Sequence, residues 1–383
     1  MSSACGQFLT AWGTRAQALT VSATRGGRAP PEAKAVQMWL LLLACVSGPS
    51  KPAPRTPVDD TGPDNTRESA ADSRTTVDSP TLTAEESLPE SIPESPPPAS
   101  VYRFVRQWGQ TGSEPGDLSH PYLMVTEPSG ALHVVETLNS RVQLFSLEGE
   151  SLRIYGGPGD GEAGLDTPKG LGISPRGETW VPDLNHDRIA VFDGAGVFQR
   201  SVGSPGAGEG QLDGPFGVGF DSDGLAYVAD YQNDRVVVFD DSGLFVRSFG
   251  GTGTGDGQFM RPSGVLISGD TVFVADTLGD RVQLFSRDGE WRETWGGPGT
   301  ALGQLDDPHG LAMDTAGYLY VAEQFNGRVQ KFAPDGTPVC LIGAPGEGDG
   351  LLNWPFGVEV GPAGEVFIAD SFHDRIVVYQ PDP

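Results

Sequence analysis

A unit of about 47 residues recurs six times between residue 101 and the C-terminus. Its clearest marker is an arginine that opens a β-branched run, with an acidic residue five positions before it in every copy. Successive arginines are separated by 47, 47, 46, 47 and 47 residues, and the acids keep the same spacing. The acid and arginine of each copy are, in chain order, Glu136 and Arg141, Asp183 and Arg188, Asp230 and Arg235, Asp276 and Arg281, Glu323 and Arg328, and Asp370 and Arg375. A repeat of this length is one supersecondary unit that buries its apolar faces only against its neighbours.

Each copy contains four short β-branched or aromatic runs separated by turn clusters. In residues 215–250 the runs are VGFD, LAYVAD, RVVVF and FVRSFG, and the turns between them contain DSDG, YQND and DDSG. Short apolar runs between turns rich in Gly, Asn and Asp are typical of antiparallel strands. The pattern therefore predicts an all-β, six-bladed β-propeller of four-stranded antiparallel blades.

The two ends of the repeat array are complementary. Residues 102–108 match the fourth strand of the other copies but precede the first copy, whereas the last copy ends after a third strand at 375–379. We therefore predict that residues 102–108 complete the last blade. This pairing closes the ring of blades and leaves no long unpaired strand edge.

The propeller accounts for residues 101–383, and the chain before it differs in composition. Residues 46–100 are rich in Pro, Ser, Thr and acids and nearly free of aromatics, so they are predicted to form a disordered linker. Residues 1–45 are interpreted as a targeting region, whose apolar run 38–45 is too short to span a bilayer. The order Leu42, Leu43, Ala44, Cys45 resembles a bacterial lipobox, in which the cysteine is lipidated.

That resemblance implies a protein of the bacterial cell envelope, lipid-anchored at Cys45 on the periplasmic or the outer surface. The membrane would be reached through this anchor only, and the linker would hold the propeller away from it. A cleaved signal with a secreted product and an accidental apolar run are the alternatives.

The repeat itself resembles a known family. The pattern P-x-G-[VL], then YVAD, four residues and R-[VI]-x-x-F is similar to the NHL repeat, as in PFGVGFD…AYVADYQNDRVVVF and PHGLAMD…LYVAEQFNGRVQKF. The resemblance covers residues 101–383 and implies a six-bladed propeller. It leaves the activity open, because a propeller is a scaffold for unrelated functions.

The acidity of the chain argues against a nucleic-acid partner. The net charge is −26, and residues 101–383 contain 17 Lys and Arg against 40 Asp and Glu. Some NHL propellers bind RNA through a basic face, and phosphate binding requires the cations that this domain lacks. The same acidity favours a soluble monomer.

The repeated acid and arginine are predicted to form a structural ion pair across each four-residue turn, because a guanidinium group suits a carboxylate. The glycine-rich connections, such as GSPGAGEGQLDGP, resemble phosphate-binding loops in composition only, since no helix follows them. A ligand site is expected instead where the six copies differ.

The position after the repeated proline differs among the copies. In a propeller, the fourth-to-first and second-to-third connections share one face, called the top, and this position lies near the channel mouth on that face. The residues there are Tyr122, Lys169, Phe216, Ser263, His309 and Phe356, and Tyr231, Phe325 and Phe372 lie in neighbouring turns. A concave mouth with aromatics and few cations favours a protein, a peptide or a small apolar ligand. Packing between blades is the competing interpretation.

Two residues suggest an enzyme as the alternative. Pro308-His309-Gly310 resembles a motif of the peptidyl-amidoglycolate lyases, in which histidines from several blades hold zinc, but the equivalent positions of the other blades lack such ligands. Glu359 is the only acid at its first-strand position, whereas a calcium-dependent lactonase-type centre needs about six to eight oxygens. We therefore expect a non-enzymatic binding module without a metal or cofactor, with a metal-dependent lyase or lactonase-type enzyme as the alternative.

Overall fold

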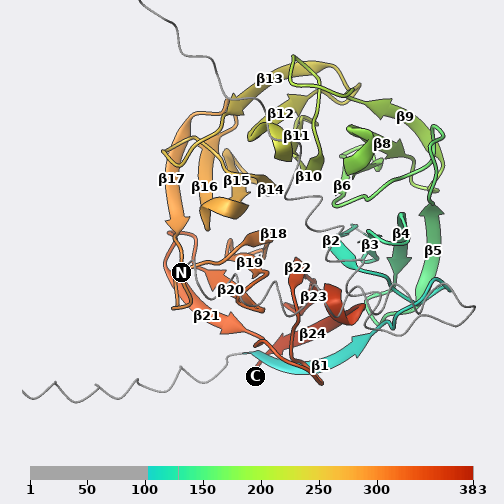
Figure 1. The fold of residues 1–383 in the computed structure, drawn as a ribbon. Coiled ribbons are helices and arrows are strands. Elements are labelled where there is room, and N and C mark those ends of the chain that lie inside the picture. Colours follow the sequence, from blue (N-terminus) through green and yellow to red (C-terminus); the bar gives the residue numbers. More distant parts are fainter. Residues whose placement is uncertain (1–101, 128, 383) are drawn as a thin grey trace, which may run out of the picture. The chain divides into compact units, whose positions relative to one another are not determined.

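Six antiparallel sheets surround a central channel in the computed structural model, which describes residues 102–127 and 129–382 (Figure 1). Each sheet has four strands, so the predicted all-β, six-bladed propeller is confirmed. Cys45, the apolar run 38–45 and the linker 46–100 lie outside the described residues, and the predictions made for them stay predictions.

The blades are numbered along the chain, and their strands are given from the channel outward. Blade 1 contains β2 (Pro121–Thr126), β3 (Leu132–Glu136), β4 (Arg141–Phe145) and β5 (Ser151–Gly156). Blade 2 contains β6 (Gly172–Ile173), β7 (Thr179–Asp183), β8 (Arg188–Phe192) and β9 (Phe198–Val202). Blade 3 contains β10 (Pro215–Phe220), β11 (Ala226–Asp230), β12 (Arg235–Phe239) and β13 (Phe245–Gly250).

Blade 4 contains β14 (Pro262–Ser268), β15 (Thr271–Asp276), β16 (Arg281–Ser286) and β17 (Trp291–Gly296). Blade 5 contains β18 (Pro308–Met313), β19 (Leu319–Glu323), β20 (Arg328–Phe332) and β21 (Pro338–Ile342). Blade 6 contains β22 (Pro355–Val360), β23 (Val366–Asp370), β24 (Arg375–Pro381) and β1 (Tyr102–Trp108). Short 3-10 turns join the second and third strands of four blades: η1 (Leu184–His186), η2 (Tyr231–Asn233), η3 (Thr277–Gly279) and η4 (Ser371–His373). No helix in the described part of the chain is long and apolar enough to cross a membrane.

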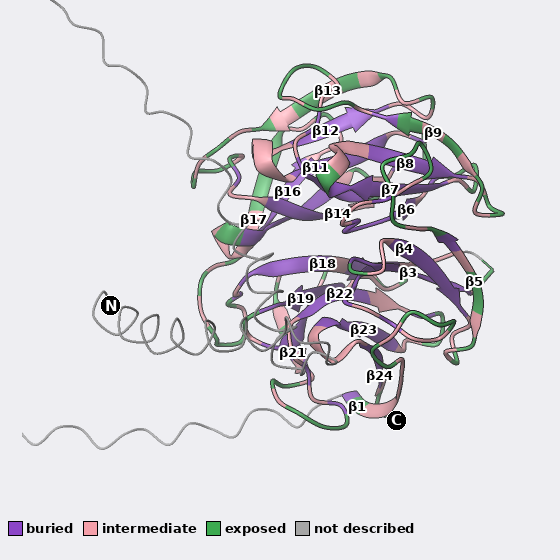
Figure 2. Ribbon diagram, turned by 45° about the vertical axis from the view of Figure 1, so that its right-hand side comes forward, coloured by how far each residue is buried: buried purple, intermediate pink, exposed green. Residues whose placement is uncertain are grey.

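The second strand of a blade is buried on both faces, and the outermost strand on one face only. Every residue of β11 and β23 is buried, which explains their continuous apolar sequences. Exposure alternates along the outermost strand β13, which forms part of the outer surface (Figure 2). The core accordingly lies between the blades: one buried cluster joins Trp180 and Ile189 of blade 2 to Val228 and Phe239 of blade 3.

Glycine allows the innermost strands to approach one another closely. A Cβ at Gly264 would lie 2.1 Å from the carbonyl oxygen of His309 in the next blade, and one at Gly357 would lie 2.2 Å from that of Tyr122. The same position is glycine in five blades, namely Gly170, Gly217, Gly264, Gly310 and Gly357. Blade 1 has Leu123 there, and its amide donates to the Lys169 carbonyl of blade 2 at 3.2 Å. Any side chain at the five glycines would push neighbouring blades apart.

The first strand of the domain closes the ring of blades as predicted. β1 pairs antiparallel with β24, in a register that runs from Tyr102 opposite Pro381 to Trp108 opposite Ile376. The indole of Trp108 contacts blade 1, with its ring centroid 6.3 Å from that of Phe145. β1 therefore both completes the last sheet and packs against the first one.

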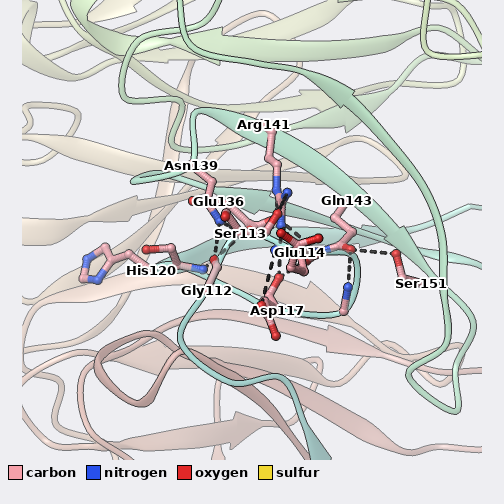
Figure 3. A network of polar contacts seen from close by, with 12 residues as sticks. Gly112, Ser113, Glu114, Asp117, His120, Glu136, Asn139, Arg141, Gln143 and Ser151 are labelled. Carbon is pink, nitrogen blue, oxygen red and sulfur yellow. Dashed lines mark hydrogen bonds and ion pairs between the residues drawn. The ribbon is translucent and has the colours of Figure 1, made fainter.

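All six acid–arginine pairs are present, with separations of 2.5 to 3.0 Å between guanidinium nitrogen and carboxylate oxygen. In blade 1, Arg141 bonds Glu136 at 2.5 Å and also donates to the carbonyl oxygens of Ser113, Glu114 and Asp117 (Figure 3). These carbonyls belong to the glycine-rich loop that leads into β2. The ion pair is thus one part of a clamp that fastens the top-face loop of its own blade.

The carboxylate of the clamp accepts further hydrogen bonds, one of them from the side-chain amide of Gln143 at 3.2 Å. Glu136 accepts the backbone N–H of Ser119 at 3.1 Å and the side-chain amide of Asn139 at 2.6 Å. In blades 2 and 6 a histidine replaces the asparagine, and Nδ1 of His186 and of His373 lies 2.7 Å from the clamp carboxylate. The spacing of acid and arginine did not predict these partners, although Asn or His two residues before the arginine is visible in five copies.

The residue before the arginine links neighbouring blades in four of the six copies. It has a left-handed backbone, and in four blades it is an aspartate that accepts the N–H of the residue before the next blade's proline. Asp374 joins blade 6 to blade 1 in this way, through the amide of His120 at 2.7 Å. Closure of the ring therefore includes the top-face loops as well as the β1–β24 pairing.

Substitution of Trp108 tests closure by β1. Trp108→Ala removes the indole that packs on Phe145 and Phe367, and we expect a loss of about 3 kcal/mol in the free energy of unfolding, measured by urea denaturation. Leu152→Ala on the exposed face of β5, where the side chain is 52% exposed, should cost less than about 0.5 kcal/mol. Equal effects of the two substitutions would contradict the proposed role of β1.

Substitution of a clamp arginine tests the architectural role of the ion pairs. Arg328→Ala leaves the fully buried carboxylate of Glu323 without its 2.8 Å partner, so we expect a loss of about 3–5 kcal/mol in the free energy of unfolding. The control is Arg103→Ala, because this side chain is 58% exposed and lies 3.9 Å from Asp382. It should change stability by less than about 0.5 kcal/mol in the same denaturation experiment.

Candidate functional site

The first residues of the innermost strands pack together and close the channel at the top face. Tyr122 and Phe356 stack with their ring centroids 4.0 Å apart, and His309 lies 4.8 Å from Phe356 and 5.6 Å from Phe216. The ammonium group of Lys169 lies 4.2 Å from the centroid of the Tyr122 ring. All five side chains are buried. We call this group the aromatic plug.

The concave mouth predicted at these positions is filled by the plug itself. The sixth residue, Ser263, is also buried, and its hydroxyl lies 2.6 Å from that of Thr277. Of the other predicted contacts, Tyr231 and Phe372 are half-buried and Phe325 is 55% exposed. The structure therefore gives the five plug residues a packing role, and their assignment as ligand contacts stays a prediction.

The histidines do not gather at one point. His309 lies 3.1 Å from the amide oxygen of Gln324, and its buried Nδ1 has no hydrogen-bond partner. Burial, with a further contribution from the nearby Lys169 charge, lowers the pKa of His120 to about 3, so this ring is neutral at physiological pH. Residues 102–127 and 129–382 contain no group of three His, Cys, Asp or Glu side chains placed to hold a metal ion.

An aromatic patch at the top of blades 5 and 6 reaches the surface. Phe325 lies 5.6 Å from Trp354, which lies 4.3 Å from Phe372 and 6.5 Å from Phe356 of the plug, all measured between ring centroids. We define Phe325, Trp354 and Phe372 as the blade 5–6 patch. Trp354 was not predicted as a site residue, although the position before the repeated proline varies as much as the position after it.

Trp354 is held in an unusual backbone conformation. Its φ is 55°, in the left-handed region that a bulky residue rarely adopts. The residues at the same position in the other blades also have positive φ, so the conformation belongs to the architecture. The turn directs a large indole into the top face only in blade 6.

Acidic side chains surround the patch on most of the top face. The glycine-rich loops expose seven of them, namely Glu114, Asp160, Glu162, Glu209, Asp256, Glu347 and Asp349. The loop of blade 5, residues 297–307, exposes no acid and presents Leu302, which is 41% exposed. We call the seven residues the acidic ring. The ring of charge is interrupted where the blade 5–6 patch begins.

Below the plug, the channel is hollow. Its volume is about 230 Å³, and the innermost strands of all six blades line it. The first residues of β2, β10 and β22 are buried, whereas their last two are partly exposed, so the channel opens on the face opposite the top. Among the lining residues, Glu359 is the only one that is neither apolar nor glycine.

Glu359 lacks the partners that stabilise the clamp acids. It stands opposite Phe367 in β23 and has apolar neighbours along the channel wall. Desolvation raises its pKa to about 8, and hydrogen bonding to Thr126 and to the Val360 amide offsets this only in part. The sequence marks this residue as an outlier and indicates a carboxylate too isolated for a calcium centre, but it does not reveal the desolvation that raises its pKa.

The pH dependence of stability tests the environment of Glu359. Because its pKa is about 8 when folded and near 4.5 when unfolded, the folded chain holds an extra proton between these values, and stability falls as pH rises. The loss is at most about 1.4 kcal/mol per pH unit. We expect the stability of Glu359→Gln relative to wild type to increase from pH 5 to pH 8 and then level off in urea denaturation. A pH-independent difference would contradict this environment.

No protein-family model and no curated protein matches the chain. The likeness to the NHL repeat therefore rests on the sequence pattern alone. Solved structures with the same fold do match. A protein of unknown function from Bacteroides thetaiotaomicron has a TM-score of 0.54 at 16% identity, over 73% of this chain and 75% of that one.

Two lyase structures are also similar. A streptogramin B lyase has a TM-score of 0.53 at 14% identity, over 73% of this chain and 98% of that one. A catalytically inactive virginiamycin B lyase from Staphylococcus aureus with quinupristin has a TM-score of 0.52 at 16% identity, with the same coverage. At these identities the similarity shows that the chain shares the propeller fold with these proteins.

Proposed function

We propose that the protein is a non-enzymatic binding module whose top face takes a basic peptide segment with apolar side chains, presented by a partner protein. The observation that supports this function is the blade 5–6 patch, in which Phe325 is exposed and Trp354 and Phe372 are half-buried, beside the blade 5 loop that exposes no acid. The proposal includes the lipid anchor at Cys45, which would hold the module at the cell envelope.

The patch is suited to contact because it is already ordered. Trp354 is fixed by its turn, by Phe372 at 4.3 Å and by the plug beneath it, and it supports the exposed ring of Phe325 at 5.6 Å. Aromatic side chains supply large contact area with few rotatable bonds, so little conformational entropy is lost when a partner binds. Leu302 extends the apolar surface along the loop that the Arg328 clamp holds.

The acidic ring favours a partner segment with positive charge. Seven exposed carboxylates lie on loops that the clamps fasten, so a basic segment gains from attraction on approach and an acidic one is repelled. The same field disfavours nucleic acid. The two lyases share only the propeller fold with this chain, and none of the residues that support the proposed function is taken from them.

Binding of defined peptides tests the proposed function. We would use short fluorescent peptides of equal length containing Lys and Leu, Glu and Leu, or Lys and Ser, and measure fluorescence anisotropy. The Lys–Leu peptide should bind best, and more weakly as salt is added, because the acidic ring contributes to association. Absence of binding by this peptide, or equal binding by the Glu–Leu peptide, would overturn the proposal.

A pair of substitutions locates the binding surface. Phe325→Ala should lower the affinity for the Lys–Leu peptide by about tenfold, because the substitution removes the exposed member of the patch. Leu244→Ala removes another exposed apolar side chain, 68% exposed in the turn between β12 and β13, and should leave the affinity unchanged. Equal weakening by both substitutions would indicate non-specific adsorption and contradict a site on blades 5 and 6.

A further inference from the structure

The hollow part of the channel is lined by apolar side chains, by strand backbone and by a single carboxylate. Innermost strands of all six blades form this wall, and the only ionisable side chain among the described lining residues is Glu359. We propose that the channel binds a small organic ammonium ion, with the ammonium group paired to Glu359 and the hydrocarbon part against the apolar side chains. This site opens opposite the top face and is independent of the proposed peptide-binding function.

The carboxylate is the group that selects the charge of the ligand. A carboxylate in apolar surroundings is unfavourable unless a cation or hydrogen-bond donors accompany it. Glu359 is hydrogen-bonded to Thr126 and to the Val360 amide, but the lining residues include no lysine, arginine or histidine to supply a positive charge. An ammonium ligand supplies both the missing charge and N–H donors, whereas a neutral or acidic ligand supplies no charge or the wrong one.

The other ionisable groups near β22 do not take this role. The strands and the turn packed against β22 carry Tyr122, His309, Tyr320, Glu323, Arg328, Lys331, Asp370 and His373, none of which lines the channel. The bases among them are engaged elsewhere: Arg328 with Glu323 at 2.8 Å, and Lys331 with Asp314 at 3.3 Å. Glu359 is therefore the group that a bound cation meets.

The volume limits the ligand to a small molecule. At about 30 Å³ for one water-sized group, a channel of about 230 Å³ holds on the order of eight such groups. A four-carbon alkylammonium ion fits this volume. A metal ion is less suited to the channel, because Glu359 is the only side chain among the described lining residues that offers oxygen ligands.

Calorimetric titration with n-butylammonium chloride tests this site. We expect one binding site per chain, and affinity that increases about tenfold per pH unit up to pH 8, because the proton on Glu359 must leave before the cation pairs with it. Butan-1-ol and butyrate should each bind at least about tenfold more weakly. The proposal would be overturned if titration with calcium chloride released or absorbed heat of binding while titration with butylammonium chloride did not. Equal affinities for butan-1-ol and butylammonium would overturn it as well.

Matched variants assign the binding to the carboxylate. Glu359→Gln should abolish butylammonium binding, and Glu293→Gln, which removes an exposed carboxylate from β17, should retain it. Circular dichroism establishes that each variant is folded. If Glu359→Gln does not fold, Val125→Leu narrows the channel and keeps the carboxylate, so it should weaken butylammonium binding. Full affinity in the variant tested would show that the ligand binds outside the channel.

Discussion

Backbone contact between neighbouring innermost strands sets the radius of the ring of blades. At Gly264 and Gly357 there is no room for a side chain, because the carbonyl oxygen of the next blade occupies the place of a Cβ. A ring with this spacing closes only if every sheet is complete, and the sixth sheet lacks a strand until β1 joins β24. Closure of the ring of blades and the width of the channel therefore both follow from the close backbone contact between neighbouring innermost strands.

The same radius produces a closed top and a hollow lower channel. Near the start of the innermost strands the side chains are large, as in Tyr122, Phe216 and Phe356, and six positions are enough to fill the cross-section. Farther along, Gly172 and Gly219 occupy positions equivalent to Glu359, so space remains. The top face is consequently a solid surface that recognises partners by its outline and charge, and the opposite end can enclose a small molecule.

The period and the strand pattern were sufficient to predict the fold, because the strands within each repeat pair with one another in the same order from blade to blade. Closure by residues 102–108 followed from the missing fourth strand, and the ion pairs followed from residues that face each other across a short turn, such as Asp230 and Arg235. The burial of the plug could not be predicted, because an aromatic ring at a channel mouth has the same sequence signature whether it packs or binds. Trp354 was missed because its direction depends on a positive φ that the sequence does not reveal.

Two kinds of carboxylate with a raised pKa distinguish architecture from function in this molecule. Burial raises the pKa of clamp acids such as Asp230 and Asp276, yet each has an arginine within 2.7 Å and fastens a loop. Glu359 is only partly buried and has no arginine partner, and its hydrogen bonds to Thr126 and to the Val360 amide do not offset the desolvation that raises its pKa. A group that breaks a local rule of folding in this way is expected at functional sites. The blade 5–6 patch is the second departure from sixfold symmetry, and like Glu359 it involves the blade that β1 completes.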